Sequence, residues 1–285
     1  MADKDISEKI LMRHADVFAD CENALMYDGE QRLQTENLQP APMENFGRGR
    51  ERVGNQFGDV SFYLVKRGRI KAQYIIENET RLKRKTVLRK AFCQGGAYRE
   101  QLVTGKAVYP VINMVTDWTG NGTTVPLSLH ELLAQSGTPK RELKAVDDVK
   151  LAVHHMKKLP EEVRKRFQSD MGFVVDFLSE GSFDGRKGQR IVHGEALCEM
   201  MEALTGDVRF TELIEELQRR QRGGEETIMC EYIDMLEARG EKRGERMLSK
   251  LLTELHGQGR EEDVWLAVKD ETARARFYKE FSIAD

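Results

Sequence analysis

Acidic residues at strand-like positions are the part of this sequence best suited to chemistry. Asp59 opens the mainly apolar run 59–65, and Glu77 and Glu79 follow the apolar residues that begin at Tyr74. Side chains alternate along a strand, so Glu77 and Glu79 share one face, and a neighbouring antiparallel strand brings Asp59 beside them. Three clustered carboxylates need a cation among them, and Mg²⁺ prefers such oxygen ligands. The pattern predicts a metal site; the alternative is isolated acids on the solvent face of an edge strand.

Basic residues surround these three acids. The chain carries a net charge of −3, yet between residues 48 and 90 its positive side chains gather in a basic belt: Arg48, Arg50, Arg52, Lys66, Arg67, Arg69, Lys71, Arg81, Lys83, Arg84, Lys85, Arg89 and Lys90. Lys and Arg neutralise phosphates, and a carboxylate-bound cation polarises one of them, so the combination suits phosphodiester cleavage. A solvated helix face is the alternative interpretation of the basic belt.

Several short blocks, taken together and in this order, resemble the Rpn family of recombination-promoting nucleases. The blocks are 15–20, 59–61, 75–79, 98–102 and 109–112, with Asn23, Ala24, Leu25, Arg89 and Trp118. Members of that family are often labelled transposases and belong to the PD-(D/E)XK nuclease class. The resemblance runs from about residue 4 to about residue 135 and continues more loosely through the remainder.

The resemblance implies a restriction-endonuclease-like α/β (α+β) core with a helical C-terminal extension, acting as a DNA endonuclease with Mg²⁺ or Mn²⁺. It implies that Asp59 and Glu77 bind the metal and that the residue two positions later orients the attacking water. That residue is Lys in the wider class and Gln in many Rpn-like chains, but here it is Glu79. A carboxylate binds a second cation or accepts the proton of water. The alternative is a catalytically weak or inactive DNA-binding or regulatory relative.

Further site residues follow from the same resemblance. The first helix of such cores often adds an acid to the metal site, and here we expect Asp16 rather than Asp20. The helix after the motif is expected to contact DNA phosphates through Arg81, Lys83, Arg84, Lys85 and Arg89, with Tyr98 in support. The chain departs from its relatives at Cys93 and Gln94, where Tyr and Asp are frequent.

Hydrophobic periodicity places these residues on elements. It predicts a helix over 6–26, strands over 57–65 and 69–77 joined at Arg67-Gly68, a helix over 82–103 and a strand over 108–115. Beyond residue 125 the pattern predicts helices only, over 127–136, 140–157, 160–179, 190–205 and 208–222. A glycine hinge at 222–225 then precedes a charged helix over 228–255, interrupted near Gly240 and Gly244, and a last amphipathic helix over 263–281.

Three units are expected: a nuclease-like core over 1–135, a helical extension over 136–222 packed on the core, and a charged helical segment over 225–285. The alternating charges of the last segment favour a solvated helix surface; the alternative is a homo-oligomer formed through the C-terminal helices, because their apolar stripe has no obvious partner in a short tail.

Composition is consistent with a cytoplasmic protein that has no membrane partner. The chain has 285 residues, of which 40% are hydrophobic and 33% charged, and it has no long apolar run. Its four cysteines are scattered without zinc-ligand spacing, which favours reduced thiols. His154 and His155 fall within the predicted helix 140–157 and point different ways, so we do not expect them to share a metal.

Overall fold

The computed structural model describes residues 10–41, 60–79, 82–105, 107–118, 120 and 125–283. Asp59 and Arg81, both predicted site residues, lie outside the described residues, as do Arg48, Arg50 and Arg52 of the basic belt.

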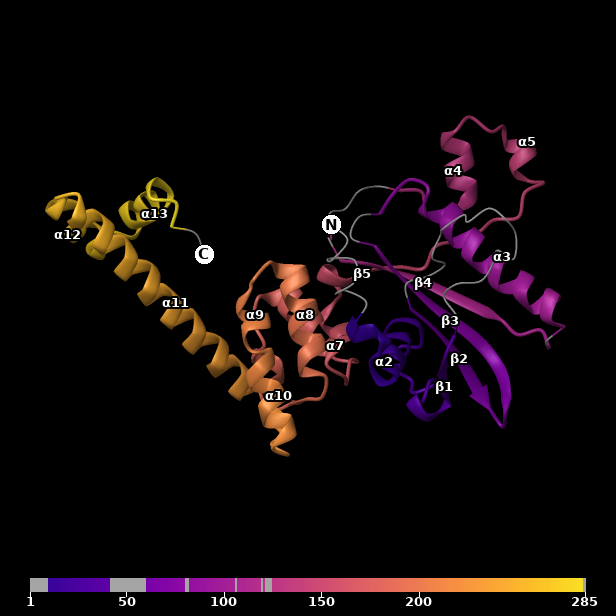
Figure 1. Cartoon of the computed structure of the whole chain (residues 1–285). Coiled ribbons are helices and arrows are strands. Elements are labelled where there is room, and N and C mark those ends of the chain that lie inside the picture. The colour runs from indigo at the N-terminus through magenta and orange to yellow at the C-terminus, as the bar shows by residue number, and fades with distance from the viewer. Residues whose placement is uncertain are drawn as a thin grey trace, which may run out of the picture.

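A five-stranded mixed sheet forms the centre of the N-terminal half (Figure 1), with strands in the order β1-β2-β3-β4-β5. The strands are β1 (Leu38–Pro40), β2 (Val60–Lys66), β3 (Arg69–Glu79), β4 (Val111–Asp117) and β5 (Val153–His155). Neighbours from β1 to β3 run antiparallel, and those from β3 to β5 run parallel. The predicted mixture of helices and strands is confirmed, and β2, β3 and β4 lie where strands were expected.

The β2–β3 hairpin aligns the segment that carries the predicted acids. Its turn residues Arg67 and Gly68 have φ values of 53° and 68°, the left-handed pair of a turn whose twist matches that of the strands. Phe62 of β2 lies opposite Tyr74 of β3, and both face the main core. The odd-numbered residues of β3 project from the other face.

Helix α3 (Thr86–Thr104) links the parallel strands β3 and β4, as a parallel pair requires. It ends at Gly105, whose φ of 61° is the left-handed conformation that glycine adopts most readily. The side chain of Gln101 exchanges two hydrogen bonds with the backbone of Tyr109, and the Val111 N–H donates to the Tyr98 hydroxyl at 3.2 Å. These bonds hold α3 against the start of β4.

Helix α2 (Ala15–Met26) covers the other face of the sheet, preceded by the short turn η1 (Leu11–Arg13). Val17, Phe18 and Cys21 are fully buried, and the rings of Phe18 and Phe62 lie 4.6 Å apart. The Asn23 side chain bonds the backbone of the loop that leads through η2 (Thr35–Asn37) to β1. Apolar burial and this polar anchor together place α2 on the sheet.

The middle of the chain is mainly helical. Its elements are α4 (Leu129–Gln135), α5 (Lys140–Leu143), η3 (Met156–Lys158), α6 (Glu161–Arg164), α7 (Met171–Glu180), η4 (Asp184–Arg186), α8 (Gly194–Thr205), α9 (Arg209–Glu212) and α10 (Ile214–Arg222). A two-stranded antiparallel sheet pairs β6 (Arg190–Ile191), which lies between η4 and α8, with β7 (Thr227–Ile228), which follows α10.

The predicted helix over 140–157 is wrong beyond residue 143, and so is the absence of strands after residue 125. The Val115 N–H donates to the Ala152 carbonyl at 2.8 Å, and Val115 pairs with Val153. Hydrogen bonds to an open sheet edge outweigh the weak helical preference of β-branched and His residues. His154 and His155 therefore lie on a strand and point to opposite faces.

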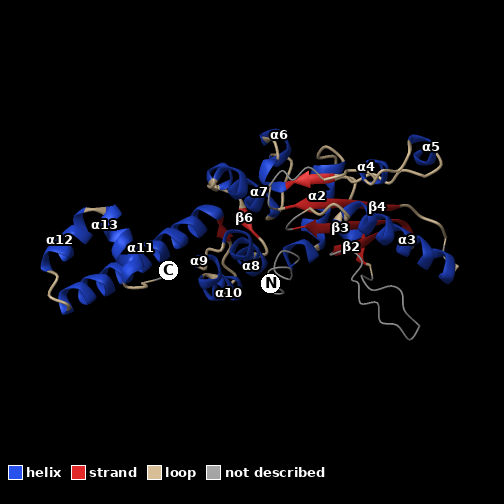
Figure 2. Ribbon diagram, turned by 90° about the horizontal axis from the view of Figure 1, so that it is seen from above, coloured by secondary structure: helices blue, strands red, loops and turns tan. Residues whose placement is uncertain are grey.

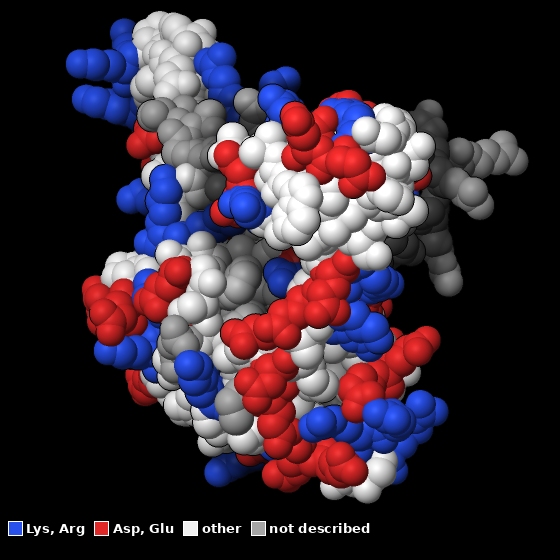
Figure 3. All heavy atoms as spheres, turned by 90° about the vertical axis from the view of Figure 1, so that its left-hand side faces the viewer, with Lys and Arg blue, Asp and Glu red and all other residues white. Residues whose placement is uncertain are grey.

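The C-terminal helices project from the rest of the molecule (Figures 1 and 2). Helix α11 (Met229–Gly257) has 29 residues, and α12 (Glu261–Lys269) and α13 (Glu271–Glu280) fold back along its far end. A separate small core holds this end together, formed by Leu251, Leu255, Ala267, Ala273, Phe277 and Ile283. Figure 3 shows acidic and basic side chains mixed over the side of the molecule to which these helices project.

Two predictions for this segment are wrong. Helix α11 continues through Gly240 and Gly244, because glycine costs a helix only about 1 kcal/mol and many neighbouring turns compensate. The helix expected over 263–281 is divided at Asp270, whose side chain accepts from the Ala273 N–H and starts α13. Homo-oligomerisation through these helices stays a prediction; Trp265 on α12 is 67% exposed.

We expect Gly244→Ala to stabilise α11 by about 0.5–1 kcal/mol, because alanine restricts the unfolded chain and favours helix. A Cβ at Gly244 meets nothing within 4 Å, whereas a Cβ at Gly240 would lie 2.7 Å from Nη1 of Arg209. Gly240→Ala is therefore the matched control and should gain less. Urea unfolding, with amide hydrogen exchange along α11, measures both, and equal gains would contradict the close approach at Gly240.

Candidate acid–cation site at the end of the parallel strands

Glu77 and Glu79 lie together near the carboxyl end of β3. Their exposed fractions are 0% and 7%, and both project from the sheet face on which α3 lies. The Asn113 side chain on β4 donates to Oε1 of Glu77 at 2.6 Å. The predicted pairing of the two acids on one face is therefore present, in an environment where charge needs a close partner.

Arg89 supplies that partner from the first turns of α3. Its Nε lies 3.2 Å from Oε2 of Glu77, and its Nη1 lies 3.0 Å from Oε1 of Glu79. One guanidinium thus joins both carboxylates, which the planar fork of arginine suits. Arg89 was predicted to bind phosphate, whereas the structure places it on the acids, with 40% of its side chain exposed.

Lys90 adds a second positive charge close to Glu77. Its side chain is buried and its Nζ donates to the backbone carbonyl of Lys150. Burial lowers the pKa of Lys90, and the nearby charge of Glu77 opposes that shift. The sheet face below α3 therefore holds two carboxylates, those of Glu77 and Glu79, together with the positively charged side chains of Arg89 and Lys90.

Asp117 and His155 extend this site across the next two strands. In the parallel ladder Glu79 pairs with Asp117, and Asp117 pairs with His155. Nδ1 of His155 lies 2.7 Å from Oδ2 of Asp117. Neither residue was predicted as a site residue, because their meeting depends on β5. The signal available was an acid and a pair of histidines, each following a short, mainly apolar run.

The opposite face of the same strands is fixed by a buried polar network. Oδ1 of Asn78 accepts from the Thr116 hydroxyl at 2.7 Å and from the Trp118 indole N–H at 3.0 Å. Because Asn78 lies between Glu77 and Glu79, these bonds set the register in which both acids meet β4.

The remaining described residues of the predicted site are spread over the surface. Lys83, Arg84 and Lys85 are exposed at the start of α3, and Arg84 donates to the Ser136 hydroxyl at 3.2 Å. Tyr98 braces α3 against β4, as its bond to Val111 shows.

Asp16 lies away from this arrangement, on the helix that covers the other face of the sheet. Its carboxylate is 2.8 Å from Nε2 of His193 at the start of α8, and the His193 ring stacks on His14 at 3.7 Å. The hydrogen bond from His193 lowers the pKa of Asp16. Burial lowers the pKa of His193, but its hydrogen bond and charge interaction with Asp16, and the charge of Asp170, outweigh burial and leave that pKa raised.

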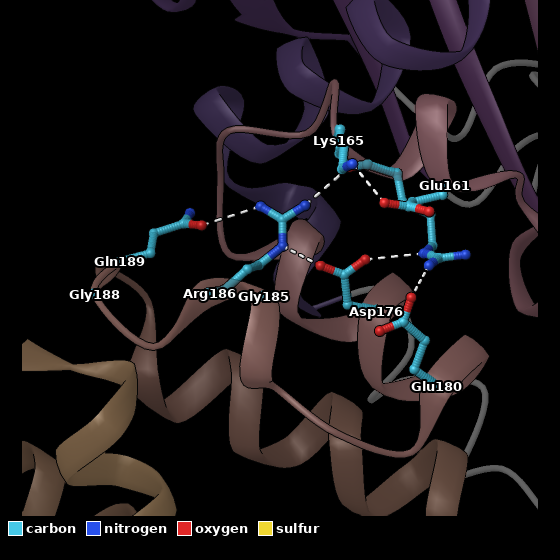
Figure 4. A pocket seen from close by; sticks show the side chains of 9 residues that line it. Glu161, Lys165, Asp176, Glu180, Gly185, Arg186, Gly188 and Gln189 are labelled. Carbon is cyan, nitrogen blue, oxygen red and sulfur yellow. Dashed lines mark hydrogen bonds and ion pairs between the residues drawn. The ribbon is translucent and has the colours of Figure 1, made fainter.

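A separate hollow of about 460 Å³ lies between α6, α7 and η4 (Figure 4). Arg164 and Arg186, both nearly buried, bond the two oxygens of Asp176, and Arg164 also reaches Glu180. Arg186 donates to the backbone carbonyls of Arg164 and Phe167 as well. The charged walls of this hollow therefore brace three elements against one another.

Comparison with protein-family models, curated proteins and solved structures finds no match to this chain. Among the described residues, no three His, Cys, Asp or Glu side chains are grouped so as to hold a metal ion. Within the same ranges, no helix is both long and apolar enough to cross a membrane. The chemistry of this site must therefore be argued from the geometry of its own residues.

Asp176→Ala should destabilise the fold by about 3 kcal/mol, because it leaves two nearly buried guanidinium groups without their shared carboxylate. Glu161→Ala in the same hollow removes only an exposed pair with Lys165 and should change stability little. Urea unfolding of both variants tests this difference, and equal effects would contradict the bracing role of Asp176.

The Asp16–His193 pair should make stability depend on pH. Because the folded-state pKa of His193 is raised above its ordinary 6.5, the pair's contribution is present below pH 6.5 and declines as the pH rises through that raised pKa. Asp16→Asn should therefore reduce stability near pH 6 by on the order of 1 kcal/mol, seen as a lower Tm. Its effect should become smaller as the pH rises through the raised pKa of His193. Glu36→Gln, at an exposed acid, is the control. A Tm difference that stays constant with pH would contradict this linkage.

Proposed function

We propose that this chain is a metal-dependent DNA endonuclease of the recombination-promoting type, which hydrolyses phosphodiester bonds. The observation that carries the proposal is the buried pair Glu77 and Glu79, bridged by Arg89 of the following helix. The order α2, β2, β3, α3, β4, with the short strand β1 added between α2 and β2, is compatible with the PD-(D/E)XK core to which the sequence bears a resemblance.

The donor set fits a hard divalent cation. Glu77 and Glu79 present carboxylate oxygens on one face, and Arg89 already provides positive charge where a cation would lie. In the proposed site Glu77 and Glu79 hold Mg²⁺ or Mn²⁺ together with Asp59, which immediately precedes Val60 of β2. When bound, the cation polarises the phosphate and lowers the pKa of water.

The other charged residues are assigned to DNA. With 40% of its side chain exposed, Arg89 can turn from the acids toward a phosphate. The exposed Lys83, Arg84 and Lys85, with Arg81, contact the DNA backbone without regard to sequence. In this proposal Glu79 orients the attacking water.

A second candidate function is DNA binding without cleavage. Arg89 forms an ion pair with one oxygen of each acid, so the acid pair has positive charge beside it without a metal. The basic residues at the start of α3 would then bind the DNA backbone while Glu77 and Glu79 serve only to hold α3 on the sheet.

Nicking of supercoiled plasmid with Mg²⁺, with Mn²⁺ and with EDTA tests the first candidate. We expect metal-dependent nicking by the wild type and none by Glu77→Gln, because the remaining ligands do not hold a cation that demands near-octahedral oxygens. Glu79→Gln should cleave as fast or faster at saturating Mg²⁺ but need more metal for half its maximal rate, because one negative charge is lost. Glu254→Gln, at an exposed acid on α11, is the control.

Two results would decide against cleavage at this site. Nicking by Glu77→Gln at the wild-type rate would show that cleavage does not depend on the acid pair. Absence of nicking by the wild type, together with DNA binding whose salt dependence falls by about 0.9 in slope for each of Lys83, Arg84 and Lys85 changed to Gln, would establish the second candidate.

A further inference from the structure

Asp117 and His155 form a hydrogen-bonded dyad beside the acid pair. They end neighbouring parallel strands, and their side chains meet at 2.7 Å between Oδ2 and Nδ1. Asp117 is the ladder partner of Glu79, so the three side chains leave the sheet in one row on the face that α3 covers.

The two members of the dyad differ sharply in exposure. The Asp117 side chain is 1% exposed, whereas 42% of the His155 side chain is accessible. The Asp117 carboxylate is therefore held in place by its surroundings, and it fixes the Nδ1 edge of the His155 imidazole. The rest of that ring is open to a bound molecule. Such an arrangement orients a histidine toward a ligand.

The hydrogen bond also selects the tautomer of the imidazole. An ionised carboxylate only accepts, so in the neutral ring Nδ1 carries the proton and Nε2 keeps its lone pair. A lone pair directed by a buried carboxylate is the requirement for a histidine that takes a proton from a nucleophile.

Glu79 is less suited to that role than His155. Arg89 holds Oε1 of Glu79 at 3.0 Å, and Glu79 as a whole residue is only 7% exposed. Neighbouring strands lie about 4.8 Å apart, so the Cα atoms of His155 and Glu79 are about 10 Å apart, with buried Asp117 between them. A phosphate and its attacking water would therefore lie at the exposed part of the His155 side chain, not between the two residues.

We propose that His155 is the general base of the DNA-cleaving reaction and that Asp117 is its positioning residue; this inference rests on the proposed endonuclease function. Nε2 of His155 takes a proton from water as the water oxygen forms a bond to phosphorus. The bond between phosphorus and the leaving sugar oxygen breaks, and that oxygen takes a proton from solvent. Protonated His155 then returns its proton to solvent, so that atoms and charge balance.

The test compares plasmid nicking by the wild type, His155→Ala and Asp117→Asn, each first shown by thermal unfolding to be folded. We expect kcat to fall about 10²-fold or more in His155→Ala, with DNA affinity unchanged, because general-base catalysis contributes about that much. Added imidazole should restore part of the His155→Ala rate, since it supplies the missing base. His256→Ala, at an exposed histidine on α11, is the matched control and should keep the wild-type rate with or without imidazole.

Asp117→Asn addresses the positioning role separately. An asparagine amide can donate to Nδ1, which moves the imidazole proton to Nε2 and removes the lone pair. We expect a fall in kcat that imidazole does not restore, because the His155 ring still occupies the site.

The outcomes separate this inference from the proposed function. Wild-type nicking with an unchanged kcat in His155→Ala overturns the inference and leaves the endonuclease function standing. A loss of rate in folded His155→Ala that imidazole does not restore also overturns it, because the histidine then has only a structural role. Absence of nicking by the wild type in every metal overturns both.

Discussion

The burial of two acids side by side on β3 is the constraint on which the arrangement around them depends. Removing a carboxylate from water costs several kcal/mol unless it is paired and hydrogen-bonded. Glu77 is fully buried, and Arg89 and Asn113 each reach one of its oxygens. Helix α3 must therefore dock with Arg89 above β3. The bond that Gln101 donates to the Tyr109 carbonyl and the bond that Tyr98 accepts from the Val111 N–H hold the helix there.

The two faces of the sheet carry different kinds of side chain. Below α3 lie the charged groups, while the opposite face carries the Asn78–Thr116–Trp118 network and the apolar core under α2. The α2 side is apolar enough that burial raises the pKa of Glu22 well above its usual range. Because successive side chains of β3 point to opposite faces, the charged site and the apolar core lie on the two sides of the same sheet.

Local patterns predicted more of this structure than pairings distant in sequence. The hairpin at Arg67-Gly68 and the shared face of Glu77 and Glu79 follow from alternation and turn chemistry, and both are present. Strand β5 was missed because a three-residue strand has little pattern of its own and is ordered by hydrogen bonds to β4. The dyad of Asp117 and His155 was missed with it. The bridge from Arg89 to Glu77 and Glu79 was not predicted, because it depends on how α3 docks on the sheet. Hydrophobic periodicity does not specify that docking.

The projecting helix α11 has a mechanical consequence. With 29 residues at 1.5 Å each it is about 43 Å long. The small core at its far end joins α12 and α13 to it. A tilt of about 10° at its base would move the far end of α11 through about 7.5 Å, since displacement is length multiplied by the angle in radians. Small changes in packing where α11 leaves α9 and α10 would thus be amplified at Trp265, whose exposed indole makes it a natural fluorescent reporter of that motion.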